Sequence, residues 1–166
     1  MNLLWDLYWP MLTAALIIGV IAGAVAFRKR KRSLALAGIG AALILGWAWH
    51  DPAGAGEKFA SSVERQTRQV LVDFEMAQVR ARIERNPLRR TLVLSGPADD
   101  FQRGELVRIL DDVPGILNVH WSNSPARSAL PILLEVELAA LVSFGLGLLL
   151  SYLLELRRRS NAQWRW

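Results

Sequence analysis

No cysteine occurs among the 166 residues of this chain. This absence excludes disulfides, thiolate metal ligands, a covalently attached c-type haem and a cysteine nucleophile. Histidine occurs only twice, at His50 and His120, and two separated histidines do not make a zinc site. The sequence also lacks a phosphate-binding loop, a zinc-protease motif, a dinucleotide-binding glycine pattern and the serine, histidine and aspartate order of a hydrolase. We therefore expect neither enzyme activity nor a metal site.

Charged residues are missing from three apolar runs, 7–27, 33–49 and 138–154. About 20 helical residues cross the roughly 30 Å hydrocarbon core of a bilayer, and about 17 is the lower limit. We therefore expect an α+β membrane protein with three transmembrane helices, of which the first two form a hairpin over 1–50 and the third covers 130–156. The first run does not resemble a signal peptide, because its basic cluster follows the apolar residues instead of preceding them.

The basic residues behind the net charge of +5 lie in two short clusters beside the apolar runs. The positive-inside rule makes 28–32 a cytoplasmic loop and 157–166 a cytoplasmic tail. The N-terminus and the polar segment 51–129 are then periplasmic, in a bacterial inner membrane. The residues that set this topology are Arg28, Lys29, Arg30, Lys31, Arg32, Arg157, Arg158 and Arg159.

Aromatic and small residues support the same topology. Tryptophan favours the membrane interface, and small residues four apart let helices approach closely, either within the hairpin or against a partner. The tryptophans near expected interfaces are Trp5, Trp9, Trp47 and Trp49 on the outer side and Trp164 and Trp166 on the inner side. The small residues predicted at helix interfaces are Gly19, Gly23, Ala42, Gly46, Ser143 and Gly147.

The polar segment 51–129 has 11 basic and 11 acidic residues, so it lacks the excess charge of a nucleic-acid-binding domain. Its apolar periodicity and turn residues predict a two-layer αββαβ domain with short linkers, which we expect to stay close to the outer membrane face. In chain order we expect a helix over 57–74, a strand over 79–84, a turn at 86–87, a strand over 91–94, a helix opened by an Asp99 and Gln102 capping box, and a strand over 116–121.

Two segments of this predicted domain form one continuous pattern. The sequence LVLSG at 92–96 is followed by a predicted helix, and then by VPGI at 113–116 and Val119. This pattern resembles the BON domain. The resemblance covers about 57–121 and is to the variant found in envelope proteins of the OmpA-like group. It implies a non-catalytic periplasmic module that binds membranes or proteins. The chain departs from common members because it has one copy, held between membrane spans.

Four groups of polar residues are candidates for chemistry. Asp99 and Asp100 are paired carboxylates, but their place at a helix start favours capping. Asp111 and Asp112 are expected at a solvated helix end. Glu135 and Glu137 lie at the outer edge of the third span, where no partner acid in the other spans would complete an ion path.

His50 is the fourth candidate. It follows Gly46 by one helical turn, a spacing that resembles the pigment-ligating pattern of bacterial light-harvesting helices, and histidine also ligates haem iron. The alternative is a solvated histidine at the interface. We therefore predict no cofactor for the chain alone, with a His50 ligand only where a complex supplies a pigment or haem.

Two functions fit these features. The first is a non-enzymatic accessory subunit of a larger inner-membrane complex, photosynthetic or respiratory by analogy, which docks on integral membrane subunits through its spans and its domain. Trp121 is a candidate anchor, with a buried structural tryptophan as the alternative. The second is a free-standing envelope protein that binds phospholipid or cell-wall partners. Its candidate lipid-headgroup residues are Arg80, Arg82, Arg89 and Arg90.

Overall fold

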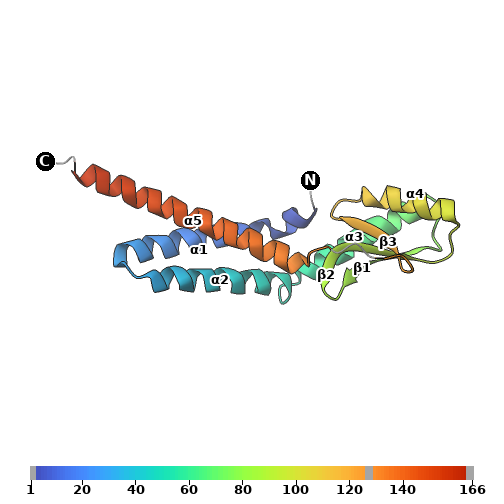
Figure 1. Ribbon diagram of the computed structural model, residues 1–166, viewed down its shortest axis with the longest axis horizontal. Coiled ribbons are helices and arrows are strands. Elements are labelled where there is room, and N and C mark those ends of the chain that lie inside the picture. Colours follow the sequence, from blue (N-terminus) through green and yellow to red (C-terminus); the bar gives the residue numbers. More distant parts are fainter. Residues whose placement is uncertain (1–2, 126–128, 164–166) are drawn as a thin grey trace. The chain divides into compact units, whose positions relative to one another are not determined.

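The computed structural model describes residues 3–125 and 129–163 (Figure 1). The chain divides into two compact units. The αβ domain contains Gly54–Leu134 together with the first residues through Leu7, and the helical unit contains Tyr8–Ala53 together with 135–163.

The helical unit is built from three long apolar helices. They are α1 (Leu3–Lys29), α2 (Arg32–His50) and α5 (Ile132–Gln163). Each has the length and composition needed to cross a membrane, which confirms that the three uncharged runs form helices of membrane length. The predicted inner-interface residues Trp164 and Trp166 lie outside the described residues.

The basic clusters are more helical than we expected. Both helices of the hairpin extend into the predicted loop, so that only Arg30 and Lys31 separate α1 from α2. Helix α5 continues through Arg159, where Arg159 Nε donates a 2.9 Å hydrogen bond to Glu155 Oε1 one turn earlier. Arginine and lysine are good helix formers, and such a pair four residues apart supports a helix.

Glycines bring α1 and α5 to backbone contact. A Cβ atom added to Gly19 would overlap the backbone carbonyl of Phe144, and one added to Gly147 would overlap the backbone carbonyl of Leu16. These two glycines expose only hydrogen atoms, so the helix axes can approach more closely than larger residues permit. The sequence pattern of small residues is therefore used inside this unit.

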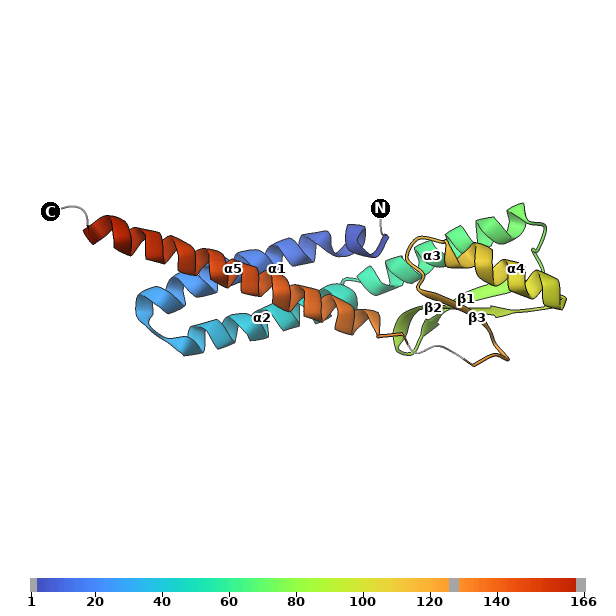
Figure 2. The same ribbon diagram turned by 45° about the horizontal axis from the view of Figure 1, so that its top comes forward.

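The αβ domain has the element order predicted from the sequence. Its elements are α3 (Ala55–Asp73), β1 (Arg80–Arg85), β2 (Leu88–Ser95), α4 (Asp100–Asp111) and β3 (Asn118–Trp121). Strand β2 is central, paired antiparallel with β1 and parallel with β3. Both helices pack on one face of the sheet, which makes two layers (Figure 2).

Local sequence explains the turns of this domain. The β1–β2 hairpin turns at Asn86 and Pro87, which are joined by a cis peptide. Gly96 and Gly115 have φ angles of +131° and +102°, conformations that other residues rarely adopt. Helix α4 begins at the predicted capping box, since Asp99 Oδ1 accepts from the Gln102 backbone N–H at 2.7 Å.

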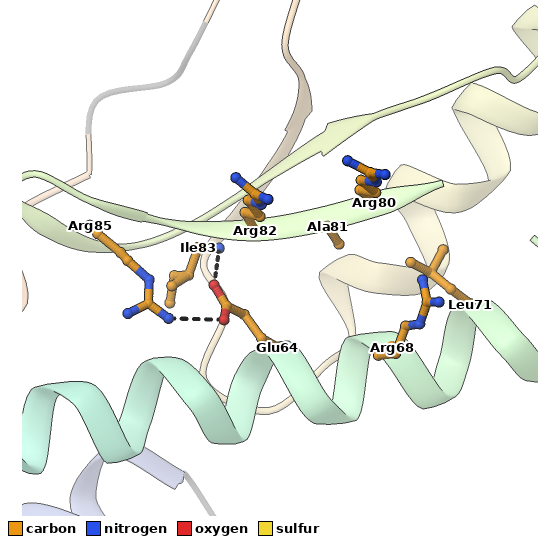
Figure 3. Close-up of a pocket in the computed structure, with 8 residues that line it drawn as sticks. All are labelled: Glu64, Arg68, Leu71, Arg80, Ala81, Arg82, Ile83 and Arg85. Atoms are coloured by element: carbon orange, nitrogen blue, oxygen red, sulfur yellow. Dashed lines mark hydrogen bonds and ion pairs between the residues drawn. The ribbon is translucent and has the colours of Figure 1, made fainter. Parts of the chain in front are cut away.

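The interior of the domain is formed by alternate strand residues and by one side of each helix. Phe59 and Val63 of α3, Leu92 and Leu94 of β2, and Leu110 of α4 are fully buried. They follow the strand period of two and the helix period of 3.6 that predicted the elements. This arrangement leaves the opposite face of β1 without a helix (Figure 3).

Candidate functional sites

A groove of about 510 Å³ lies between α3 and the free edge of β1 (Figure 3). Four arginines and one glutamate give its lining a positive balance of charge. The lining residues are Glu64, Arg68, Leu71, Arg80, Ala81, Arg82, Ile83 and Arg85. An arginine-rich groove is a candidate site for an anion, so the partners of each guanidinium decide what the groove can bind.

One end of the groove is closed by a cluster of charges. Arg85 donates to Glu57 Oε2 at 2.5 Å and to Glu64 Oε2 at 2.9 Å. The hydrogen bond from Arg85 lowers the pKa of Glu57, and the two carboxylates raise the pKa of Arg85. Glu64 Oε1 also accepts the backbone N–H of Ile83 at 3.2 Å, which occupies a donor on the strand edge. At this end the charge of Arg85 is therefore compensated by carboxylates, and the Ile83 N–H is not free to pair with another strand.

The four arginines predicted to contact lipid headgroups are divided by the fold. Arg80 and Arg82 are exposed and extend from the face of β1 opposite α3 (Figure 3). Arg89 forms an ion pair of 3.1 Å with Glu84. Arg90 is buried, and its Nε donates a 2.9 Å hydrogen bond to the Gly115 carbonyl. Its guanidinium therefore stabilises the turn before β3 and is not presented at the surface.

Trp121 is an interior residue. This is the second of the two roles that the sequence allowed, a buried structural tryptophan instead of an interface anchor. It is 6% exposed, its Nε1 donates to the Arg103 carbonyl at 3.3 Å, and the Arg103 guanidinium lies 5.2 Å from its ring centroid. These contacts join β3 to α4. The exposed aromatic residues of the domain are instead Phe74, at 54%, and Phe101, at 78%.

Phe74 and Phe101 belong to the same end of the domain. Phe74 caps the C-terminus of α3, and Phe101 is the second residue of α4. Both views show that α3 ends and α4 begins at this end (Figures 1 and 2). The connections are close together, because a Cβ atom added to Gly96 would lie 2.8 Å from the Gln78 carbonyl oxygen. Apolar periodicity did not identify Phe74 and Phe101 as exposed residues. Both fit the apolar pattern of a helix and therefore resemble core positions.

The small residues predicted at interfaces mostly contact helices of the same unit. Ala42 and Gly46 are buried, and Ser143 is half-buried. A Cβ atom on Gly23 would lie 2.7 Å from Ser151 Cβ. The sequence allowed these residues to serve either the hairpin or a partner, and the structure uses them to pack the three helices.

His50 has a partner within the helical unit. Its Nδ1 lies 2.6 Å from the hydroxyl of Tyr8, and the two rings stack with centroids 6.1 Å apart. Tyr8 belongs to α1 and His50 is the last residue of α2, so this hydrogen bond joins the two helices. The Tyr8 side chain is fully buried. A ligand role would leave only Nε2 for an iron or magnesium centre, with Nδ1 held by Tyr8.

The two acids near the start of α5, Glu135 and Glu137, differ from each other in their surroundings. The Glu137 carboxylate packs against Gly46, where a Cβ atom would lie 2.8 Å from Oε1, and it hydrogen-bonds to the Trp47 backbone. Its Oε2 is buried without a partner. Glu135, in contrast, is not without a partner. Gly46 thus admits a carboxylate between α2 and α5, a contact that a larger residue would block.

The remaining carboxylates have structural or solvent roles. Asp99 caps α4, and Asp100, Asp111 and Asp112 are exposed at the two ends of that helix. Across residues 3–125 and 129–163, no group of three or more histidine, aspartate or glutamate side chains could hold a metal ion. His120 lies half-buried on β3, and its Nδ1 has no partner there.

Comparison with protein-family models, with curated proteins and with solved structures gave no match.

Proposed function

We propose that this chain is a non-enzymatic, membrane-anchored docking subunit of a larger assembly in a bacterial inner membrane. Its extramembrane αβ domain would be BON-like and periplasmic, and its partners would be integral membrane subunits. Photosynthetic and respiratory complexes are the classes of assembly that we would examine first. The observation that carries the proposal is the pair of exposed phenylalanines, Phe74 and Phe101, at one end of the αβ domain.

Exposed phenylalanine favours contact with a partner because each ring keeps a large apolar area in water. Single exposed apolar residues are common, but two aromatic rings at one end of a small domain are a candidate contact surface. Aromatic residues are also enriched at protein interfaces. Val72, which is 48% exposed, is a further exposed apolar residue in the last turn of α3, two positions before Phe74.

The fold features of the domain support the BON-like part of the proposal. The order α3, β1, β2, α4, β3 is the order expected for that family. The two motif glycines, Gly96 and Gly115, both have positive φ angles, which gives a conformational reason for glycine at those positions. These features concern the architecture, so partner choice needs a direct test.

The test uses native membranes and the full chain. A photo-crosslinking amino acid is placed at position 101, and the membranes are extracted in mild detergent and sized. We expect one protein to be crosslinked in stoichiometric amount and to co-migrate with the unmodified chain. The double variant Phe74→Ser and Phe101→Ser should then lose that protein from the complex.

Leu117 provides the matched control, because it is 50% exposed and stands at the beginning of β3, away from the α4 start. Leu117→Ser should leave the complex intact, and a crosslinker at position 117 should not capture the same protein. The proposal is wrong if the wild-type chain runs as a small particle in every mild detergent, or if both sets of variants have equal effects.

A second candidate function is recognition of phospholipid headgroups by the domain. Arg80 and Arg82 are exposed, and neither has an ion-pair partner within the described ranges. The test is modification of arginines by a dicarbonyl reagent in nanodiscs made with or without phosphatidylglycerol. Headgroup binding predicts protection of Arg80 and Arg82 by the anionic lipid, with Arg65 of α3 as an exposed control. Equal modification in the two lipids would exclude this function.

A further inference from the structure

A second groove, of about 220 Å³, lies between α1 and α5 within the helical unit. Its floor is apolar and its mouth is charged. The lining residues are Val20, Ala24, Arg28, Ser151, Leu154, Glu155 and Arg158. Neither the docking surface nor the headgroup candidates of the αβ domain include any of them.

The groove follows from the way the two helices cross. Glycines bring α1 and α5 to backbone contact, and close to the groove Ser151 donates a 2.6 Å hydrogen bond to the Val20 carbonyl. Beyond this contact the helices diverge toward their charged ends (Figures 1 and 2). Ala24 of α1 lines the groove, and its small side chain leaves the space open.

The charges at the mouth do not balance. Glu155 is the acid of this groove, and it already accepts a 2.9 Å hydrogen bond from Arg159. Arg158 is 4.0 Å from the same carboxylate. Arg28 makes no hydrogen bond to any residue of the described ranges, although its charge acts on Glu155. One carboxylate therefore faces three guanidiniums on two different helices, and two positive charges remain uncompensated.

We propose that this groove is a binding site for an anionic phospholipid. The phosphate would lie between Arg28 and Arg158, and an acyl chain would cover Val20, Ala24 and Leu154. The surroundings favour this ligand because the groove opens at the end of two helices that are long and apolar enough to span a membrane. Basic pockets between transmembrane helices bind anionic headgroups, and the groove provides both the charge and the apolar surface that a lipid needs.

The experiment measures lipid retained by the full chain. The protein is released from nanodiscs of phosphatidylcholine containing phosphatidylglycerol, and bound lipids are counted by native mass spectrometry across a lipid titration. The double variant Arg28→Gln and Arg158→Gln should bind phosphatidylglycerol roughly tenfold more weakly, because two contacts with the phosphate are lost. The matched control, Arg30→Gln with Arg157→Gln, removes the same charge from the same clusters outside the groove and should change binding less than threefold.

A second pair of variants tests the apolar floor without changing any charge. Ala24→Leu fills the groove, so it should lower phosphatidylglycerol binding while both arginines remain. Ala37→Leu adds the same side chain at an exposed position of α2 and should have no effect. Equal losses in the two arginine pairs would show general attraction to the basic clusters and would overturn the site. Full binding by Ala24→Leu would also overturn it.

Discussion

In the helical unit the helices meet through residues with almost no side chain, whereas in the αβ domain the layers meet through large apolar side chains. Gly19 and Gly147 admit backbone atoms, while Phe59 and Leu92 fill the space between helix and sheet. The difference follows from the solvent. Lipid tails solvate apolar side chains as well as another helix does, so association there depends on close packing and hydrogen bonds. In the αβ domain, removing apolar area from water lowers the free energy of the folded state.

Polar contacts differ between the units in the same way. Two of the polar contacts between helices of the helical unit are short hydrogen bonds, from Ser151 to the Val20 carbonyl and between Tyr8 and His50, each at 2.6 Å. The αβ domain has ion pairs at its surface, including Arg85 with two glutamates. Short hydrogen bonds therefore stabilise the contacts between the helices of the helical unit. Burial of apolar side chains stabilises the αβ domain. Four substitutions test this contrast.

Phe59→Ala should have the largest effect. Removing a fully buried ring leaves a cavity and costs about 3–5 kcal/mol of unfolding free energy, which is a large share of the stability of so small a domain. Hydrogen-exchange mass spectrometry of the full chain should show lost protection in β1 and β2 with α5 unchanged. Phe101→Ala, at an exposed site, is the control, and equal losses from the two variants would contradict this account.

Gly147→Ala should have the next largest effect. Its Cβ atom would overlap the Leu16 carbonyl, and overpacking of this kind costs about 1–3 kcal/mol. Because the chain has no cysteine, spin labels can be attached at single introduced cysteines on α1 and α5. The distance between the labels should lengthen and its distribution broaden.

Gly145→Ala is the matched control for that substitution. Gly145 lies two residues away on the same helix, and its Cβ atom would meet nothing within 4 Å. The label distances should therefore stay at the wild-type values. A shift as large as that of Gly147→Ala would show that the glycine contact is not what sets the crossing of α1 and α5.

Asp99→Ala should cost about 1 kcal/mol, because it removes the acceptor of the α4 capping box. Asp99→Asn keeps an oxygen acceptor and should cost less than half as much. Hydrogen exchange of the first turn of α4 measures both effects. The cap interpretation fails if the asparagine variant exchanges as fast as the alanine variant.

Arg85→Gln should have the smallest effect, no more than about 0.5 kcal/mol at pH 7, because the ion pairs are largely exposed and screened by water. The pKa of Glu57 is lowered by Arg85, so the stabilisation is present above the ordinary value of 4.5 and is lost as the pH falls through the lower folded pKa. The difference between wild type and variant should therefore disappear in acid and in high salt. Arg80→Gln is the control, since Arg80 has no ion pair within the described residues. A difference that persists in acid would exclude this cause.

Sequence patterns predicted the elements because each depends on neighbours along the chain. An uncharged run of membrane length, alternation over 79–84 and the Asp99 and Gln102 spacing all act within one or two turns of the element that they specify. The partners of charged side chains were not predicted in this way. Arg89 and Arg90 are adjacent in sequence, but alternation along β2 sends one to a glutamate at the surface and the other into the interior.

Three apolar runs of membrane length, a neutral polar segment between the second and third, and the order of helices and strands in that segment all follow from the amino-acid sequence. Packing in three dimensions sets which small residues meet, makes Trp121 and Arg90 interior residues, and brings Arg28 and Arg158 to one groove. The two kinds of information differ because of distance along the chain. Periodicity reports which side of an element is apolar, but the contact between α1 and α5 joins residues more than a hundred positions apart, and only their packing brings those side chains together.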